Sequence, residues 1–543
     1  MRAQFTDFHV GTTCAPTRAG LHTGHYCNSA GVWHTIGGRS LLREDEWTLA
    51  TALSAEGYAC SHFGKWRESS IIRARPFSVR VARLMCVGAP DLGDASPFRA
   101  FERGFDLSIA HGGGGIGNTQ DGWGNDYFDD IYEVNGEPQR FEGYCTDVFF
   151  AEAAKFASEH KEQPFMTYIA CNAPHSPFNV EKRYSSRYTD ATAYLGDGAT
   201  DRAGFYGMVT CIDDNVAKMR DHLESLGVLQ DTIFIFMTDN GSGGGVTMGP
   251  DGHVEESAAN YNCGMRGIKG SPYEGGHRVP FIFNYPRLTD TGRDVDSLTS
   301  YVDFMPTLLE LCGVSAQPPR PFHGRSLVPF LNGGDEAEAA AAEFAGRCMV
   351  TDTQRVPRPV KWRNSCVMRG RLRMIDGKEL YDLGSDPGQR VDIADSVGAD
   401  DLAELRAAYE EWWELVSDQF DRDISFALPM AEHIDPMKLT THDIRNEAGD
   451  AVWNQGEVRA GKAVAGYWAV DVRRAGRYSI ELRRWPAETG YAISAGIDGD
   501  DVPWNREDID PKEESNYSGG QAIDLRWAQL SIGGTDYQGA PAR

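Results

Sequence analysis

Over residues 1–320, short apolar runs alternate with segments of helical periodicity, and this alternation restricts the fold more than any other feature. The runs 165–170 (FMTYIA) and 233–237 (IFIFM) are typical of strands buried on both faces. A helix is expected over 147–159, with Thr146 as its N-cap. Apolar residues recur at helical spacing at Val209, Ile212, Val216, Met219, Leu223 and Leu226. The pattern predicts an α/β fold in which helices flank a mostly parallel sheet.

The pattern changes twice after residue 320. The run ELYDLGSDPGQ from Glu379 predicts a strand and a turn, and a helix face follows at Leu402, Leu405, Tyr409, Trp412 and Val416. Beyond about residue 428, apolar residues alternate with period two at Trp468, Val470, Val472, Tyr478, Ile480 and Leu482. This is typical of a hairpin in a small β-sandwich. We therefore expect a large α/β domain over 1–320, a smaller α+β subdomain over 321–427, and a shortened β-rich accessory domain over 428–543.

Composition excludes several classes of protein. The 53 basic and 79 acidic side chains give a net charge of −26, which argues against a general nucleic-acid binder. An anionic substrate must therefore be held by a local cluster of cations or by a metal. The 11 cysteines include no C-x-x-C pair, which excludes a zinc ribbon and a dense disulfide framework. We find no apolar run that would span a bilayer and no signal peptide.

One basic stretch departs from this composition. Residues 67–91 hold five arginines in an otherwise acidic chain. Two interpretations are open, a solvated insertion loop or a misread segment of the gene.

The segment 13–24 (TCAPTRAGLHTG) is the most informative motif. A helix that begins near Pro16 would place Cys14 at a helix N-terminus, with the guanidinium of Arg18 close by. Both features favour negative charge at Cys14. The alternative is a buried, inert cysteine.

Polar motifs also follow the two apolar strands. His175 follows 165–170, and Asp239 and Asn240 follow 233–237. Ligands bind beyond the carboxyl ends of strands in open α/β sheets, so these residues are expected to share a crevice. Asp239 and Asn240 offer the hard oxygens that suit Ca²⁺ or Mg²⁺. The alternatives are an ordinary turn and a packing histidine.

Three further residues lie in glycine-rich contexts that allow the backbone to approach a ligand closely. Lys65 lies in FGKW, and Lys269 lies in RGIKGSPYEGGHRVP. His111 opens HGGGGIG, which we interpret as a flexible loop at the mouth of the pocket. Solvated lysines and a plain surface loop are the alternatives.

Taken together, these motifs resemble those of the sulfatase family. CAPTR with AGLHTG is similar to the C-x-P-S/T-R signature whose cysteine becomes formylglycine, and FGKW, APHSPF, FMTDNG and IKGSPYEGGHRVP follow in the family's order. The similarity extends over most of residues 1–420 and is nearest to bacterial arylsulfatases with an arylsulfatase A/B-like core. It implies an alkaline-phosphatase-like fold and a sulfuric ester hydrolase.

The resemblance also implies roles for the residues. Cys14, oxidised to formylglycine and hydrated, would attack the sulfur of a sulfate ester and later release sulfate by re-forming the aldehyde. Asp239 and Asn240, with the modified Cys14, would hold Ca²⁺, or Mg²⁺ in its place. Arg18 would orient the diol, and Lys65 and Lys269 would hold sulfate oxygens. His175 would bind the ester oxygen and protonate the leaving group.

The implied partners are a sulfated small molecule or carbohydrate and a formylglycine-generating maturation enzyme. Nucleic acid and a membrane span are not expected. Family analogy predicts a periplasmic or secreted enzyme.

Three departures from the family pattern lead to a further expectation. The chain begins after the Asp pair that completes the family's metal site, with no strand before the Cys14 motif, and Asp7 does not match that pair. GKW is followed by Arg67 where the family has His-Leu-Gly, and the C-terminal β-rich segment stops early. We therefore expect weak or no metal binding and strongly reduced turnover.

Two other functions stay open at this point. One is an inactive sulfatase-like fragment or a carbohydrate-binding protein, in which Trp453, Trp468 and Trp485 would stack on sugars unless they form the core of the sandwich. The other is a phosphoesterase of the same superfamily.

Overall fold

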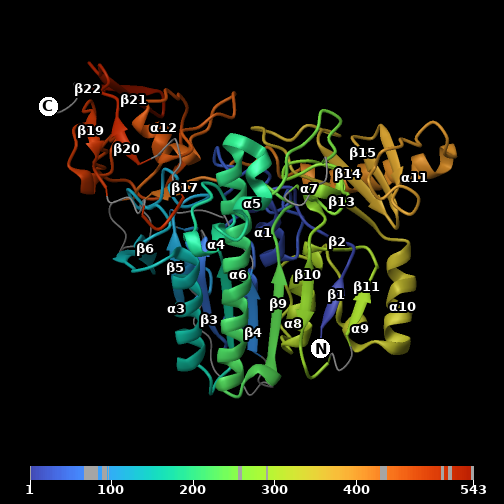
Figure 1. The fold of residues 1–543 in the computed structure, drawn as a ribbon. Helices are drawn as coiled ribbons and strands as arrows, with labels where there is room; N and C mark the ends of the chain where they lie inside the picture. Colours follow the sequence, from blue (N-terminus) through green and yellow to red (C-terminus); the bar gives the residue numbers. More distant parts are fainter. Residues whose placement is uncertain are drawn as a thin grey trace.

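The computed structural model describes residues 2–65, 83–87, 95, 97–254, 260–288, 292–428, 437–502, 507–510 and 517–539. Its centre is a ten-stranded sheet of order β11-β1-β10-β9-β4-β8-β3-β5-β6-β7 (Figure 1). The five middle strands from β9 to β5 are mutually parallel, whereas β10, β1 and β6 each pair antiparallel with a neighbour. The strands are β1 (Ala3–Phe5), β3 (Ala59–Lys65), β4 (Arg83–Val87), β5 (Leu107–His111), β6 (Ile131–Val134), β7 (Glu137–Arg140), β8 (Phe165–Ala170), β9 (Thr232–Met237), β10 (Phe281–Asn284) and β11 (Arg293–Val295). The predicted mostly parallel sheet is confirmed.

Helices cover both faces of this sheet. Along β8, Met166 and Tyr168 join the core beneath α1, α2 and α8, while Phe165 and Ile169 join the core beneath α3 and α6. Burial on both faces explains why this strand is a continuous apolar run. The helices are α1 (Cys14–Thr23), α2 (Leu49–Ala55), α3 (Cys145–Glu159), α4 (Lys182–Ser185), α5 (Thr189–Thr192), α6 (Ala199–Ser225), α7 (Glu274–His277), α8 (Phe304–Leu311), α9 (Val328–Asn332), α10 (Gly334–Ala345), α11 (Ala399–Ser417) and α12 (Gln455–Arg459). Short 3₁₀ turns lie at Ala100–Glu102, Ala193–Gly198, Leu229–Asp231, Tyr301–Asp303, Thr441–Asp443 and Ala487–Thr489.

Both predicted helices form, but two details of the prediction are wrong. Helix α3 begins at Cys145, so Thr146 lies inside it, and the N-cap position is Tyr144 without a side-chain cap. In α6 the buried face includes Met219 and Leu223, whereas Val209 is 44% exposed. The spacing of apolar residues predicts which side chains share one face of a helix. How many of them are buried depends on the element that packs against that face.

Two segments near the start of the chain contain strands that we did not expect. The Cys14 motif is preceded by β1 and by β2 (Phe8–His9), which pairs with β12 (Thr299–Ser300). The basic stretch 67–91 contains β4, which lies between β9 and β8 at the centre of the sheet. The interpretation of 67–91 as a loop is therefore wrong for 83–87, where Leu84 and Met85 are buried. Residues 67–82 and 88–91 lie outside the described residues.

The segment from 321 to 427 has the expected strand, turn and helix. A four-stranded antiparallel sheet is formed by β13 (Cys348–Asp352), β14 (Ser365–Arg369), β15 (Leu372–Ile375) and β16 (Glu379–Asp382). Helix α11 packs on it and buries Leu405, Tyr409, Trp412 and Val416, as the helical spacing predicts.

The predicted hairpin beyond residue 428 is wrong. Strand β18 (Val470–Val472) pairs in parallel with β17 (Phe426–Leu428), and residues 476–482 are in no strand. Tyr478, Ile480 and Leu482 are exposed. The described remainder holds two-stranded pairs, β19 (Ile497–Asp500) with β20 (Ser518–Gly520) and β21 (Ala528–Ile532) with β22 (Thr535–Gly539). Trp485 is buried, whereas Trp453 and Trp468 are half-buried.

None of the helices in the described part of the chain is long and apolar enough to cross a membrane.

Candidate active site

The carboxyl ends of the parallel strands carry the chemistry-bearing residues. Lys65 is the last residue of β3 and pairs in register with His111, the last residue of β5. His175 lies in the turn after β8, which neighbours β3 on its other side. Asp239 lies in the turn after β9. Candidate residues that end or follow four strands therefore lie at the carboxyl end of the sheet, where the sequence predicts a shared crevice.

Cys14 is the first residue of α1. The helix starts two residues before the expected Pro16, so the thiol-bearing residue itself lies in the first turn. Cys14 is 3% exposed, and all ten residues of the helix are buried. The N-terminal N–H groups of the helix favour negative charge beside Cys14, as expected from the motif.

The next turn of α1 joins the turn after β9. The Nε of Arg18 donates to Oδ2 of Asp239 at 2.8 Å, and its Nη2 pairs with the same oxygen. The hydroxyl of Thr17 donates to the backbone carbonyl of Asp239 at 2.6 Å. These contacts bring the Cys14 motif and the Asp-Asn motif together, although Thr17 and Asp239 are 222 residues apart in the chain.

Asp239 and Asn240 are the oxygen donors of the predicted metal site. The Nδ2 of Asn240 donates to the carbonyl of Gly241 at 2.9 Å. Its Oδ1 is buried and has no hydrogen-bond partner among the described residues. A buried amide oxygen without a donor, next to a carboxylate, suits a hard cation such as Ca²⁺. Ca²⁺ takes 6–8 oxygen ligands, so these two residues would supply only part of its shell.

The loop that carries Lys269 connects the two motifs. The backbone N–H of Lys269 donates to the carbonyl of Ser242 at 3.0 Å, two residues after Asn240. The next N–H, of Gly270, donates to the carbonyl of Thr12 at 2.8 Å, two residues before Cys14. The backbone at Lys269 is therefore tied to both motifs.

His175 lies in a positively charged environment. Burial holds the pKa of its imidazole well below the ordinary value, and the charges of Lys269 and Lys65 lower it further. Its Nδ1 is 2.8 Å from the carbonyl of Ser176, so Nδ1 carries the proton and Nε2 is the remaining lone pair. The two lysines beside the neutral His175 thus supply the local positive charge that an acidic protein needs to hold an anion.

His111 is not in a flexible loop, in contrast to our interpretation, because it ends strand β5 and is 1% exposed. Burial lowers the pKa of His111 to about 3, and Lys65 and Arg18 contribute. Its Nε2 has no hydrogen-bond partner in the described part of the chain. The sequence reasoning missed His62, which is fully buried on β3 with Nε2 3.3 Å from the carbonyl of Lys65. The sequence signal that could have identified His62 is a histidine within a buried strand, in SHFGK.

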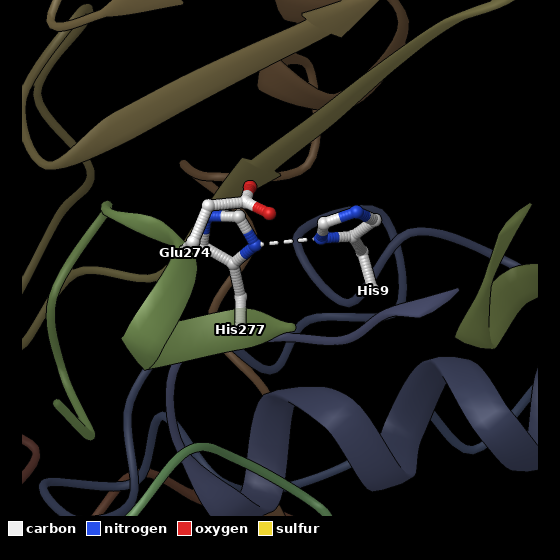
Figure 2. Close-up of side chains that lie close together, drawn as sticks. All are labelled: His9, Glu274 and His277. Carbon is white, nitrogen blue, oxygen red and sulfur yellow. Dashed lines mark hydrogen bonds between the residues drawn. The ribbon is translucent and has the colours of Figure 1, made fainter. Parts of the chain in front are cut away.

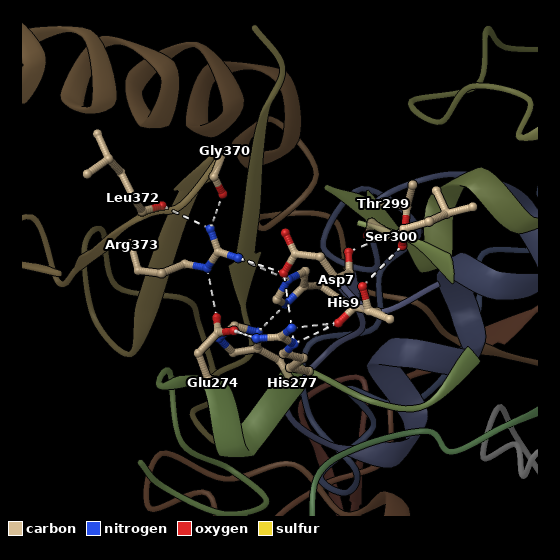
Figure 3. A network of polar contacts seen from close by, with 12 residues as sticks. Asp7, His9, Glu274, His277, Thr299, Ser300, Gly370, Leu372 and Arg373 are labelled. Carbon is tan, nitrogen blue, oxygen red and sulfur yellow. Dashed lines mark hydrogen bonds and ion pairs between the residues drawn. The ribbon is translucent and has the colours of Figure 1, made fainter. Parts of the chain in front are cut away.

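A buried network lies behind the loop that carries Lys269 (Figure 3). Arg373 of β15 donates to Oε1 of Glu274 at 2.7 Å and to Oδ1 of Asp7 at 2.9 Å. The same Asp7 oxygen is 2.9 Å from Nε2 of His9. Nδ1 of His9 is 2.9 Å from Nδ1 of His277, whose Nε2–H donates to the carbonyl of Pro272 at 3.0 Å. The network joins the first residues of the chain to α7 and to the β13–β16 sheet.

His9, Glu274 and His277 are the one group of three ligand-type side chains close enough to share a metal ion, within the part of the chain that is described (Figure 2). A cation there would lie beside the guanidinium of Arg373, which is fully buried. Both oxygens of Glu274 already accept hydrogen bonds, from Arg373 and from Arg278. Although burial opposes ionisation, Arg373 lowers the pKa of Glu274 to about 2. The charges are balanced without a metal, so we interpret the group as structural.

Asp7 belongs to this buried network. Burial opposes its ionisation, but His9 and Arg373 hold its pKa well below the ordinary value. Its carboxylate is therefore committed to the buried network and not to Asp239 and Asn240, in line with the expectation that Asp7 does not replace the family's Asp pair.

Comparison with known families gives two matches. The sulfatase family model matches residues 3–314. A second model, described as N-sulphoglucosamine sulphohydrolase, C-terminal, matches residues 269–412.

Two curated relatives illustrate the similarity. The uncharacterized sulfatase YdeN of Escherichia coli (strain K12) is 25% identical over 346 residues, which are 62% of this chain and 56% of that protein. Arylsulfatase A of Bos taurus is 26% identical over 480 residues, which are 80% of this chain and 84% of that protein. The chain thus spans little more than half of the length of YdeN.

Solved structures share the fold. Ps i-CgsB in complex with k-i-k-neocarrahexaose superposes with a TM-score of 0.60 at 20% identity and covers 77% of this chain and 90% of its own. BT4656 in complex with its substrate D-glucosamine-2-N,6-O-disulfate superposes with a TM-score of 0.53 at 17% identity and covers 78% of this chain and 92% of its own.

Proposed function

Because the chain belongs to the sulfatase family, we propose that it hydrolyses sulfate monoesters, either aryl sulfates or sulfated carbohydrates, through a formylglycine derived from Cys14. The observation that carries the proposal is the arrangement of Cys14, Arg18, Lys65, His175 and Lys269 at one edge of the sheet. A thiol at a helix N-terminus beside these cations meets the needs of an anionic ester, which the acidic remainder of the protein would repel.

Each residue has a role that follows from its position. Lys65 and Lys269 bind the sulfate oxygens and offset the charge that develops on them. Arg18 orients the group at position 14 while it remains paired with Asp239. When the ester binds, its negative charge offsets the lysine charges that lower the pKa of His175. The imidazole then takes up a proton more readily and donates it to the leaving-group oxygen.

Formylglycine would supply the nucleophile as a hydrated aldehyde, which an unmodified thiol does not provide. A maturation enzyme that oxidises Cys14 is therefore a required partner. Asp239 and the orphaned Oδ1 of Asn240 would hold Ca²⁺, or Mg²⁺, which polarises sulfate oxygens when it is bound. The incomplete oxygen shell supports weak binding of this ion.

The structural neighbours support a sulfated carbohydrate as the substrate class, because BT4656 was solved with a sulfated glucosamine as its substrate. Family analogy further supports a periplasmic or secreted location and an organisation into 1–320, 321–427 and 428–543.

The test is to co-express the chain with a formylglycine-generating enzyme and to measure the mass of the Cys14 peptide and the hydrolysis of 4-methylumbelliferyl sulfate. We expect the mass of the aldehyde form and sulfate release that Cys14→Ala abolishes. The matching aryl phosphate is the control for a phosphoesterase. Hydrolysis of the phosphate alone, or an unmodified thiol with no hydrolysis, would contradict the proposal.

A further inference from the structure

Residues 112–124 form a glycine-rich loop that lies against His175. A Cβ atom on Gly115 would be 3.2 Å from Nδ1 of His175, a contact tighter than ordinary packing, so the absence of a side chain at position 115 favours the close approach of the loop. The N–H of Ile116 donates to Oδ1 of Asn172 at 3.1 Å, and the carbonyl of Asn172 accepts from the N–H of His175 at 2.9 Å. The position of the loop therefore sets the position of the turn that carries His175.

A buried carboxylate shapes this loop from within. Asp121 accepts hydrogen bonds from the N–H of Gly112 at 3.1 Å, the N–H of Gly117 at 2.9 Å and the Nδ2 of Asn125 at 2.9 Å. These bonds close the loop on itself, but they do not attach it to the rest of the molecule.

Besides the bond from Ile116 to Asn172, the loop is attached by α12, more than 300 residues further along the chain. The backbone N–H of Gln455 donates to the carbonyl of Gly117 at 3.0 Å. Its side-chain Nε2 donates to the carbonyls of Asn118, at 3.3 Å, and Gly122, at 2.9 Å, and its Oε1 accepts from the N–H of Gly124 at 2.9 Å. Gln455 is 1% exposed, so no solvent competes for these bonds.

Neighbouring residues of the same segment support the attachment. The N–H of Thr119 donates to the carbonyl of Trp453 at 3.2 Å. The indole N–H of Trp123 donates to Asp501 at 3.0 Å, and Asp501 also pairs with Arg459 at 2.7 Å. The guanidinium of Arg459 lies over the ring of Trp123, 4.4 Å from its centroid. Figure 1 shows α12 above β5 and β6, on the same side of the molecule.

We propose that Gln455 is a positioning residue, through which the C-terminal segment holds the 112–124 loop against His175 and so sets the efficiency of sulfate ester hydrolysis. This proposal rests on the proposed function. It gives the segment beyond residue 428 a part in the active site, in place of the independent accessory role that its sequence pattern predicts.

The test compares two isosteric substitutions. Gln455→Met removes the four side-chain hydrogen bonds to the loop and keeps the volume of the side chain. Asn215→Leu is the matched control, because Asn215 is also a buried amide that bridges two elements, from α6 to Asp147 of α3 at 2.9 Å. Both variants are measured by thermal unfolding, by kcat and KM on the sulfate ester, and by hydrogen–deuterium exchange of residues 112–124.

We expect Gln455→Met to lower kcat/KM on the order of tenfold to a hundredfold and to speed exchange in 112–124. Asn215→Leu is expected to lower the Tm similarly but to keep kcat/KM within about twofold, since it is remote from the chemistry. Unchanged kcat/KM and exchange in Gln455→Met, or equal losses of activity in both variants, would overturn the inference. If the unsubstituted protein hydrolyses no sulfate ester, the proposed function fails, and the exchange data alone decide whether Gln455 holds the loop.

Discussion

Arg18 and Asp239 form a partly buried ion pair that joins the helix of the Cys14 motif to the turn after β9, with Arg18 2% and Asp239 20% exposed at the side chain. The pair is both a structural link and a part of the candidate site. Because Arg18 Nε and Nη2 contact the same carboxylate oxygen, the other oxygen of Asp239 is left for a cation. This division explains how one carboxylate can serve both an arginine and a metal.

Replacement of Arg18 should reveal the structural part of this link. Arg18→Leu leaves a partly buried carboxylate without its partner, so we expect the free energy of unfolding to fall by about 3 kcal/mol. Urea unfolding in the presence of a chelator measures it. Arg325→Leu is the control, because its pair with Glu343 is exposed and should contribute less than about 1 kcal/mol. Equal effects of the two substitutions would contradict the prediction.

Substitution of Lys269 should lower the rate of substrate hydrolysis and leave the stability of the fold unchanged. Lys269→Met removes one of two positive charges beside His175, and we expect kcat/KM to fall on the order of a hundredfold, mainly through the reaction step. Steady-state hydrolysis of an aryl sulfate measures this. Lys218→Met is the control, since Lys218 is exposed on α6 and pairs only with Asp147 among the contacts described for it. A change of less than about threefold in Lys269→Met would be inconsistent with a sulfate-binding role.

Substitution of Asp239 should affect calcium binding, whereas substitution of Asp7 should affect stability. Asp239→Ala is expected to abolish calcium binding, because it removes one of the two oxygen donors at the crevice. Asp7→Asn should leave calcium binding unchanged but lower the free energy of unfolding by about 3–5 kcal/mol, because Arg373 and His9 lose a buried partner. Calorimetric calcium titration and urea unfolding separate the two effects. Loss of calcium binding in Asp7→Asn would place that residue in the metal site instead.

Stability should depend on pH through buried neutral histidines. Burial lowers the pKa of His22, His34, His111, His277 and His323 to about 3, from 6.5. Between these values the unfolded chain binds more protons than the folded one. The free energy of unfolding is therefore fully retained above about pH 6.5 and is lost as the pH falls toward 3.

A substitution tests this assignment. We expect His111→Gln to reduce the slope of the unfolding free energy against pH by up to one proton, or about 1.4 kcal/mol per pH unit, between pH 4 and 6. Urea unfolding at several pH values gives the slope. An unchanged slope would mean that His111 takes up its proton in the folded state.

The sequence predicts much of this fold because the responsible signals are local. The run 165–170 is buried at every position and apolar at all but Thr167, because β8 is covered by helices on both faces. Helix α11 was found from its spacing because its single buried face packs on one sheet. In the same way, the position of His175 and Asp239 directly after apolar runs was sufficient to expect both at one end of the sheet, whereas Cys14 was added to them by the family resemblance.

Other features were missed because they depend on a partner elsewhere in the chain. Residues 83–87 lie in an arginine-rich stretch, and they form a strand because β8 and β9 offer open edges on both sides. Residues 478–482 have a strand-like alternation, but no described strand pairs with them. The alternation of apolar residues specifies a face, whereas hydrogen bonding to a neighbour makes the strand.

By itself, the sequence identified the candidate site residues and determined that a mostly parallel sheet would present them. Only the tertiary structure decided that Lys65 and His111 stand in register, that Asp7 is held by Arg373, and that Gln455 reaches the loop beside His175. The physical reason is that side-chain type and periodicity are properties of a few adjacent residues. Register, charge pairing and loop attachment depend on groups that are distant in the chain and meet only when the whole core is packed.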